Sequence, residues 1–298
     1  MKKILLFFMA AFMALSASAA KAHAKHVVLI ALDGWGAYSV PKAAGIPNIR
    51  ELMKKGSYTL HSRSVLPSSS AINWASMFMG VGTEQHGYTE WGSRTPEIPS
   101  EVVNAHGIFP TIFSIVREQR PQAETACLYE WIGIKYLVDT LAVSHLDYVG
   151  ESDKNPSLLC EKAEAYIQAR KPALVAVCFD QLDHTGHVDG HDTPAYYATL
   201  ERIDGYIGRI VEAVRRAGIY DDTVFILTSD HGGKDKGHGG KTLAEMEIPF
   251  IMAGKNVRPL GAFPQAMMQY DTAATIAYLL GVEPPQAWRG QPANWAIR

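Results

Sequence analysis

The sequence has little cysteine, little charge and no excess of either sign, and each shortage excludes a class of protein. Three cysteines in a chain of 298 residues cannot form the framework of a disulfide-stapled domain. Charged residues make up 19% of the chain, and 28 Lys and Arg against 30 Asp and Glu leave a net charge of −2. A nucleic-acid-binding protein that depends on a basic surface is therefore excluded. No pattern in the sequence predicts an oligomeric state.

Long hydrophobic runs are also absent, with one exception at the N-terminus. Met1–Lys3 is a short basic start, Ile4–Leu15 is an uncharged apolar run, and Ala17–Ala19 offers small residues for a signal peptidase. The run is shorter than the ~20 residues that cross a membrane as a helix. We therefore predict a signal peptide over residues 1–19, with cleavage after Ala19 or, alternatively, after Ala24, and a periplasmic or secreted protein without a membrane span. A buried N-terminal helix is the alternative.

Apolar residues make up 47% of the chain, and their spacing predicts a layered α/β domain. Continuous apolar, β-branched runs indicate buried strands of a mostly parallel sheet, and helical spacing separates them. The predicted strands are His26–Leu32, Ala173–Phe179, Thr223–Thr228 and Ile248–Met252, and the predicted helices are Pro110–Glu118, Ser157–Arg170, Pro194–Ala217 and Asp271–Leu280. We predict one domain over residues 20–298, with an irregular insertion at about 88–150.

Aspartate and histidine residues followed by glycine stand where three of these strands end. Taken one at a time, such residues are more often turn or capping residues or local pairs. The carboxyl ends of neighbouring parallel strands meet at one edge of a sheet, so clusters far apart in sequence can converge. Asp and His together suit Zn²⁺, with Mn²⁺ as the alternative. The three clusters predict a metal site from Asp33, from Asp183 and His187, and from Asp230, His231 and His238.

A candidate nucleophile lies in Ser68–Ser70, where a serine-rich turn enters a predicted helix. Backbone N–H groups at a helix N-terminus favour an anion, and a hydroxyl that also contacts a metal can attack phosphorus. The alternative is that these serines only cap the helix. The local sequence does not distinguish among the three hydroxyls.

The order of these residues resembles the alkaline phosphatase superfamily, and within it the type I phosphodiesterase/nucleotide pyrophosphatase branch and related exported bacterial phosphatases. The resemblance runs from about His26 to the C-terminus. It implies a three-layer α/β/α sandwich, two divalent metal ions and a small-molecule phosphate ester as substrate. It also implies that a phospho-serine intermediate forms and is then hydrolysed.

The resemblance also implies a role for each matched residue. Ser70 is the expected nucleophile, because it lies three residues before Asn73. Apart from the resemblance, Asn73 and His184 are candidate substrate-binding residues, and His184, which adjoins Asp183, could bind phosphate or hydrogen-bond a ligand carboxylate. The expected ligands are Asp33, Asp230 and His231 for the metal that Ser70 also contacts, and Asp183, His187 and His238 for the second metal.

One departure bears on the substrate. The family carries an Asn about 21 residues after its nucleophile, and this chain has Trp91 there. We therefore favour a phosphomonoesterase, with a phosphodiesterase or nucleotide pyrophosphatase as the alternative. A sulfatase is disfavoured, because Ile72 and Trp74 replace the Pro and Arg that follow a sulfatase's modified residue. A secreted binding protein with a structural metal is a further alternative, and it would need four ligands that close the site.

The remaining histidines and cysteines carry weaker expectations. His86 and His191 are predicted to be turn or surface residues, and Cys178 a buried apolar side chain. A disulfide between Cys127 and Cys160 is an open alternative after export.

Overall fold

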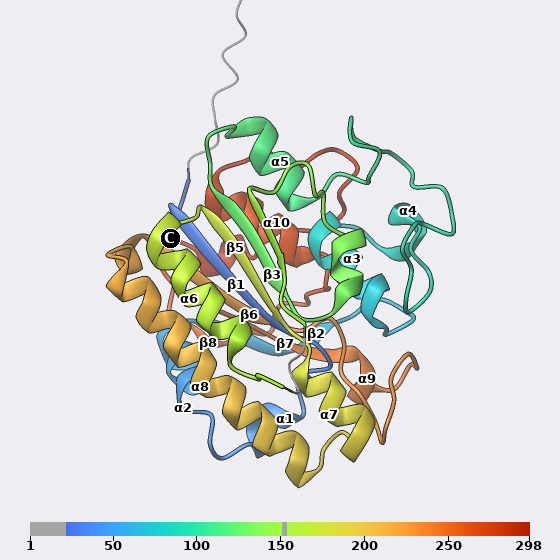
Figure 1. Ribbon diagram of the computed structural model, residues 1–298, viewed down its shortest axis with the longest axis vertical. Helices are drawn as coiled ribbons and strands as arrows, with labels where there is room; N and C mark the ends of the chain where they lie inside the picture. Colours follow the sequence, from blue (N-terminus) through green and yellow to red (C-terminus); the bar gives the residue numbers. More distant parts are fainter. Residues whose placement is uncertain (1–21, 151–153) are drawn as a thin grey trace, which may run out of the picture.

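The computed structural model describes residues 22–150 and 154–298, so the predicted signal peptide at 1–19 lies outside the described residues. An eight-stranded sheet runs through the molecule in the order β4-β3-β5-β1-β6-β7-β2-β8 (Figure 1). Its strands are β1 His26–Leu32, β2 Ser57–Arg63, β3 Thr125–Tyr129, β4 His145–Tyr148, β5 Leu174–Phe179, β6 Thr223–Thr228, β7 Glu247–Gly254 and β8 Gly261–Ala262.

The sheet is mostly parallel, as predicted. β4, β3, β5, β1 and β6 are parallel neighbours, whereas β7 runs antiparallel to both β6 and β2. β8 adds a short parallel pair at the edge of β2. The carboxyl ends of β5, β1 and β6 therefore lie side by side at one edge of the sheet.

Both faces of the sheet are covered, which explains why the central strands are apolar throughout. Along β1, Val27 and Leu29 enter one hydrophobic core, and Val28 and Ile30 enter the other. Helices α3, α5 and α10 cover the first face, and α2, α6 and α8 cover the second (Figure 1). These helices are α2 Pro47–Lys55, α3 Ser70–Met79, α5 Ile112–Gln119, α6 Leu158–Arg170, α8 Pro194–Arg216 and α10 Asp271–Leu280. The three-layer α/β/α architecture is confirmed.

Short helices connect the layers near the carboxyl ends of the strands. They are α1 Ser39–Lys42, α4 Thr83–His86, α7 Gln181–Asp189 and α9 Leu243–Met246, with 3-10 turns at Ile132–Tyr136, Tyr220–Asp222 and Asn294–Ala296. Within the described part of the chain, no helix combines the length and the apolar character needed to cross a membrane.

Part of the stretch predicted as an irregular insertion belongs to the sheet instead. Residues 88–111 hold no helix or strand, but α5, β3 and β4 follow and extend the sheet beyond β5. β4 was missed because it is four residues long and only partly buried. β2 was missed because its sequence, SYTLHSR, mixes polar and apolar residues.

The cysteines do not pair. Cys127, Cys160 and Cys178 are all free and buried. Cys127 packs in one hydrophobic core and Cys160 in the other, so the sheet separates them and the disulfide considered from the sequence is wrong.

Candidate active site

The predicted metal ligands converge because they follow three adjacent strands. Asp33 follows β1 directly, and Asp230 and His231 follow β6 after one residue. Asp183 and His187 lie one turn apart on α7, which begins just after β5. His238 completes the set from the loop between β6 and α9.

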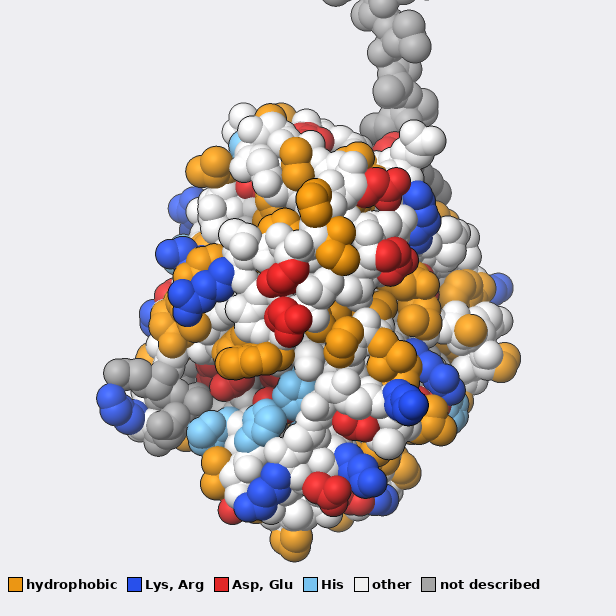
Figure 2. All heavy atoms as spheres, turned by 90° about the vertical axis from the view of Figure 1, so that its right-hand side faces the viewer, with side chains coloured by type: hydrophobic (Ala, Val, Ile, Leu, Met, Phe, Trp, Pro, Cys, Tyr) orange, Lys and Arg blue, Asp and Glu red, His pale blue; other side chains and the backbone are white. Residues whose placement is uncertain are grey.

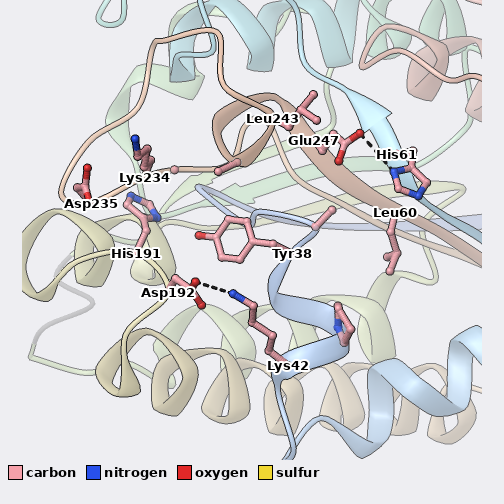
Figure 3. Close-up of a pocket in the computed structure, with 14 residues that line it drawn as sticks. Tyr38, Lys42, Leu60, His61, His191, Asp192, Lys234, Asp235, Leu243 and Glu247 are labelled. Atoms are coloured by element: carbon pink, nitrogen blue, oxygen red, sulfur yellow. Dashed lines mark hydrogen bonds and ion pairs between the residues drawn. The ribbon is translucent and has the colours of Figure 1, made fainter.

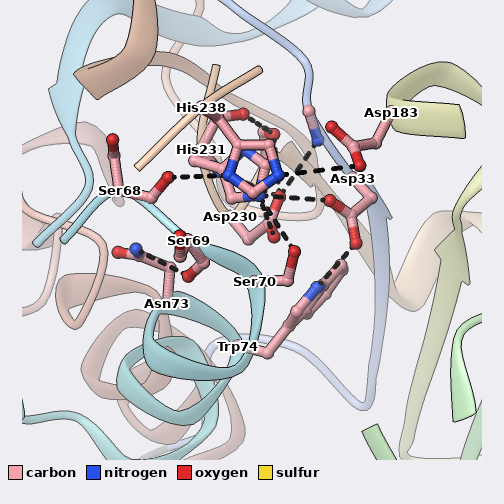
Figure 4. Close-up of polar contacts among 12 residues, drawn as sticks. Asp33, Ser68, Ser69, Ser70, Asn73, Trp74, Asp183, Asp230, His231 and His238 are labelled. Atoms are coloured by element: carbon pink, nitrogen blue, oxygen red, sulfur yellow. Dashed lines mark hydrogen bonds and ion pairs between the residues drawn. The ribbon is translucent and has the colours of Figure 1, made fainter. Parts of the chain in front are cut away.

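The first predicted ligand group surrounds one point with oxygen and nitrogen atoms. His231 Nε2 lies 3.4 Å from Asp33 Oδ1 and 3.2 Å from Asp230 Oδ2 (Figure 4). Trp74 Nε1 donates to Asp33 Oδ2 at 3.0 Å, and the His231 backbone N–H donates to Asp230 Oδ1 at 2.9 Å. The other oxygen of each carboxylate is buried without a hydrogen-bond partner. Such oxygens, aimed at one another, suit a cation.

The second predicted group adjoins the first. His187 Nε2 lies 3.1 Å from Asp183 Oδ2 and 3.2 Å from His238 Nε2, and His238 Nε2 lies 3.9 Å from Asp183 Oδ2. The His231 and His238 rings stack with their centroids 3.8 Å apart. His231 also falls within 4.8 Å of ligand atoms of Asp183 and His238, as well as of Asp33 and Asp230. The six side chains thus form one continuous cluster.

Each histidine in the cluster has its ring oriented by a backbone carbonyl. The Nδ1 atoms of His187, His231 and His238 lie 2.9, 2.8 and 3.1 Å from the carbonyl oxygens of Lys236, Gly232 and Ser68. A carbonyl only accepts, so each Nδ1 carries the proton and donates it. The Nε2 atom of each ring therefore faces the cluster, where it can offer a lone pair to a metal once it carries no proton, as metal-binding histidines do.

Without a cation, the electrostatics of the cluster are unfavourable. Burial, followed by the nearby carboxylates, raises the pKa of Asp33 and of Asp230 well above the usual range. Burial also lowers the pKa of His231 to about 3, so this imidazole stays neutral. Burial opposes ionisation of Asp183, but the hydrogen bond from His187 and the nearby histidines lower its pKa. The same hydrogen bond raises the pKa of His187 to about 9. The donor set and its charge therefore fit divalent cations.

Ser70 is the serine that reaches this cluster. It is the first residue of α3, and its Oγ lies 3.1 Å from His231 Nε2 (Figure 4). Because His231 Nδ1 carries the ring proton, Nε2 accepts from the Ser70 hydroxyl. Ser68 instead donates to the Gly240 carbonyl oxygen at 2.7 Å. Of these two serines, only Ser70 has a side-chain hydrogen bond with a predicted ligand.

Asn73 has a structural role in place of the expected contact with substrate. Its side chain is completely buried. Its Oδ1 accepts from the Val65 backbone N–H at 2.7 Å, and its Nδ2 donates to the carbonyl oxygens of Val65, Pro67 and Ser69 at 3.1–3.2 Å. The amide therefore holds the loop that carries Ser70, and it has no hydrogen left for a ligand.

An open cavity of about 200 Å³ leads to Ser70. Figure 2 shows histidine side chains gathered at a hollow on this face of the molecule. His184 is exposed at the cavity, next to the ligand Asp183. The lining residues are Ser70, Trp91, Trp131, Asp180, Asp183, His184, His187 and His238.

The sequence reasoning missed Trp131, and it misplaced two histidines. Trp131 comes two residues after β3, at the same edge of the sheet as the ligands, which is a signal that could have identified it. His86 and His191 are both buried, so neither is a surface residue. His86 is the last residue of α4, whereas His191 does lie in a turn, which was one of the two expectations for it. His86 Nε2 lies 3.0 Å from Ser76 Oγ, and His191 packs behind Asp183.

Known proteins with this fold include phosphodiesterases and sulfatases. Murine ectonucleotide pyrophosphatase / phosphodiesterase 5 superposes with a TM-score of 0.74 at 15% identity, over 92% of this chain and 100% of that one. A structure titled as a 2-O GAG sulfatase superposes with a TM-score of 0.73 at 14% identity, over 92% of this chain and 74% of that one. At such identities, these likenesses show the fold alone.

Relatives in sequence are much longer proteins. GPI ethanolamine phosphate transferase 3 of Eremothecium gossypii is 30% identical over 35% of this chain and 11% of its own length. A 2,3-bisphosphoglycerate-independent phosphoglycerate mutase of Cereibacter sphaeroides is 34% identical over 40% of this chain and 23% of its own length. Venom phosphodiesterase of Macrovipera lebetinus is 19% identical over 69% of this chain and 25% of its own length. The chain thus spans a quarter or less of these relatives.

The family described as type I phosphodiesterase / nucleotide pyrophosphatase matches residues 27–245, a range that begins in β1 and includes all six predicted ligands and Ser70. The chain belongs to this family, within the alkaline phosphatase superfamily.

Proposed function

We propose that the protein is an exported, metal-dependent hydrolase of phosphate esters that works through a phospho-serine at Ser70. One observation carries the proposal: the Ser70 hydroxyl lies 3.1 Å from His231 Nε2, at the N-terminus of a buried helix and beside both ligand groups. A site that only held a structural metal would be closed by its ligands and would need no such hydroxyl.

The chain's own residues supply the nucleophile and its orientation. The Ser70 Oγ forms a bond to phosphorus while the bond from phosphorus to the leaving oxygen breaks, and the hydroxyl proton is released. Ser70 lies at the N-terminus of α3, where the positive end of the helix dipole favours the charged phosphoryl oxygens. Water then attacks the phospho-serine, which releases inorganic phosphate and restores the hydroxyl.

Two divalent ions, most favourably Zn²⁺ and alternatively Mn²⁺, fit the donor set. Asp33, Asp230 and His231 would hold one ion, and Asp183, His187 and His238 would hold the other. When bound, such ions act as Lewis acids that lower the pKa of a nearby hydroxyl and neutralise phosphoryl and leaving-group oxygens.

Phosphate monoesters are the proposed substrates, because the lining of the cavity contains no asparagine. Trp91 stands where the family's phosphoryl-binding Asn is expected, and this residue is 67% exposed. Its carbonyl oxygen accepts from the Ala71 backbone N–H at 3.1 Å. Trp91 and Trp131 form apolar walls that suit an aromatic leaving group. The exposed His184 is placed to contact the phosphate. Family membership favours a phosphodiesterase as the second candidate.

Hydrolysis assays separate these candidates. Zn²⁺-replete protein should hydrolyse p-nitrophenyl phosphate faster than bis-p-nitrophenyl phosphate or p-nitrophenyl thymidine phosphate, and EDTA should abolish the activity. Faster hydrolysis of the diesters would establish the phosphodiesterase in place of the monoesterase. Inactivity on all three would reject the enzyme and favour the secreted metal-stabilised binding protein.

Export is proposed from residues 1–19 and has a direct test. N-terminal sequencing of protein recovered from a periplasmic or secreted fraction should begin at Ala20, or at Lys25 if the second site is cleaved. Recovery of protein that still begins at Met1, in the cytoplasmic fraction, would contradict export.

A further inference from the structure

His191 lies behind the second predicted ligand group, in a slot that only glycines leave open. Its side chain is completely buried, and its Nε2 lies 3.8 Å from Asp183 Oδ1. A Cβ atom on Gly186 would lie 2.3 Å from the His191 ring, and one on Gly233 would lie 2.2 Å from it. Any larger residue at either position would therefore displace the imidazole.

The ring is held in place by its surroundings and by its own backbone. The His191 N–H donates to the Asp235 carbonyl oxygen at 2.6 Å, and the ring packs 5.4 Å from the ring of Tyr196. The Tyr196 hydroxyl in turn donates to the Gly34 carbonyl oxygen at 2.7 Å, beside the ligand Asp33. His191 is thus held against the loop that follows β6 directly and against the turn that follows β1 through Tyr196.

The hydrogen bonding of His191 differs from that of the three predicted ligand histidines. Those three have Nδ1 fixed by a carbonyl oxygen, whereas in the described part of the chain neither ring nitrogen of His191 has a hydrogen-bond partner. Asp183 likewise has an unsatisfied acceptor: its Oδ2 faces His187 and His238, while its buried Oδ1 has no hydrogen-bond partner among the described residues. A buried donor and a buried acceptor, each unsatisfied, therefore face each other.

The other side of His191 faces a separate cavity of about 670 Å³. Figure 3 shows its ring beside Tyr38 and Asp192 at one end of this cavity, with His61 at the other end. The imidazole therefore forms a wall between the cavity and Asp183.

We propose that His191 is a positioning residue for the second metal ion, donating a hydrogen bond from Nε2 to Asp183 Oδ1 while Asp183 Oδ2 serves as the ligand. The inference rests on the proposed function, because it assumes that Asp183 binds a metal. At 3.8 Å the two atoms are neighbours, and a movement of less than 1 Å brings them into hydrogen-bond range. Carboxylate ligands are commonly oriented in this way, and loss of the outer partner costs about 10–100-fold in metal affinity.

The test measures metal affinity site by site and needs no substrate. Apo protein is titrated with Zn²⁺ against a chromophoric chelator, and Co²⁺ absorption spectra report the coordination of each ion. His191→Phe keeps a ring in the slot and loses both nitrogens, and His191→Gln places an amide N–H where Nε2 lies. His61→Phe is the matched control, because His61 lines the same cavity but is exposed and touches no predicted ligand.

We expect two Zn²⁺ ions in the wild type and in His61→Phe. In His191→Phe, one ion should bind about 10–100-fold more weakly, with an altered Co²⁺ spectrum for that ion only, and His191→Gln should restore most of the affinity. Unchanged affinity in His191→Phe would overturn the inference. So would failure of Gln to rescue the loss, since a direct metal ligand or a packing role would give that result.

A second measurement separates a folding defect from a metal defect. After EDTA treatment, the Tm of His191→Phe and of His191→Gln should differ from the wild-type Tm by no more than the Tm of His61→Phe does. The reason is that the proposed hydrogen bond matters when the ion is bound. A wild type that binds Zn²⁺ yet hydrolyses no ester would reject the proposed function and leave the His191 inference standing. A wild type that binds no Zn²⁺ would overturn both.

Discussion

At the scale of single residues, each of these side chains uses one polar atom for a hydrogen bond that fixes its orientation and directs another polar atom toward the cluster. Asp33 uses one oxygen to accept from Trp74 and leaves the other without a partner, and Asp230 does the same with the His231 backbone N–H. His231 uses Nδ1 on a carbonyl and turns Nε2 to the cluster. The unpartnered atoms meet beside Ser70, which is where an incoming phosphate ester would find both the charge and the nucleophile.

Replacement of Ser70 gives the most direct prediction at this scale. Ser70→Ala should lower kcat by at least about 10³-fold, because covalent catalysis then has no nucleophile. Zn²⁺ content measured by elemental analysis should stay largely intact, because the six predicted Asp and His ligands are unchanged. Ser69→Ala is the matched control and should keep most activity. A Ser70→Ala variant with wild-type turnover would exclude Ser70 as the nucleophile.

Sequence patterns predicted correctly that the six Asp and His residues converge, but they predicted the surroundings of these residues less well. Asp33, Asp230 and His231 could be found because they follow apolar strands almost directly, and the strand order brings them together. The role of Asn73 could not be found, because its four hydrogen bonds go to backbone atoms of a loop whose path no local pattern specifies. The burial of His86 and His191 likewise depends on long-range packing, which short polar sequences do not reveal.

At the scale of elements, the loop before α3 depends on the Asn73 side chain. Asn73→Ala removes four hydrogen bonds and leaves buried backbone groups unpaired, so we expect a loss of about 3 kcal/mol in the free energy of unfolding. Urea denaturation measures this loss, with Ser68→Ala as a milder control on the same loop. A variant of unchanged stability with a raised KM would contradict the structural role and restore the expected contact with substrate.

The contact between α3 and α4 carries a pH dependence through His86. Burial lowers the pKa of His86 to about 4, and the Tyr88 backbone N–H donates to its Nδ1 at 3.1 Å. The folded-state pKa is below the unfolded value, so this contribution to stability is complete above about pH 6.5 and is lost as pH falls toward 4. The loss amounts to about 3 kcal/mol across this range.

The variant His86→Asn tests this contribution. The Asn side chain keeps an acceptor near Tyr88 but does not titrate, so the free energy of unfolding should be lower than in the wild type at pH 8 and should depend less on pH between 4 and 6.5. Urea unfolding at a series of pH values, compared with His61→Asn at the exposed histidine, gives the difference. Parallel pH profiles for the wild type and His86→Asn would show that His86 does not titrate as proposed.

At the scale of the whole molecule, the sheet order explains why a site assembled from residues 33 to 238 is compact. β1 lies between β5 and β6, so the ligands after these three strands meet although long stretches of sequence separate them. The central strands β1, β5, β6 and β7 were predictable because burial on both faces makes them largely apolar. The edge strands β4 and β8 and their inner neighbours β3 and β2 were not, because they are short or partly polar and their pairing is decided by neighbours distant in the sequence.

Because the cluster links both cores through the sheet, removal of metal should lower the stability of the whole domain. Asp33 and Asp230 have raised pKa values in the metal-free protein, since burial and neighbouring carboxylates oppose their ionisation. For a carboxyl group whose folded-state pKa exceeds its unfolded value, stability falls as pH rises between the two values. Metal binding needs the ionised carboxylates and neutral imidazoles, so its stabilising effect should grow over the same pH interval.

We therefore expect EDTA to lower Tm more at pH 8 than at pH 5. At a free Zn²⁺ concentration of about 100 times Kd, the ion adds about 2.7 kcal/mol per site to the free energy of unfolding, or roughly 5–10 °C in Tm for one site in a domain of this size.

Calorimetry with and without EDTA at both pH values measures the effect. The double variant Asp33→Asn, Asp230→Asn supplies the control, because it removes both carboxyl groups whose pKa is raised. That variant should lose the part of the EDTA response that comes from the first ion, about half if both sites contribute equally, and should be more stable than metal-free wild type at pH 8, since two neutral amides replace two buried charges. An equal EDTA effect in the wild type and the double variant would show that these carboxylates do not hold the stabilising ion.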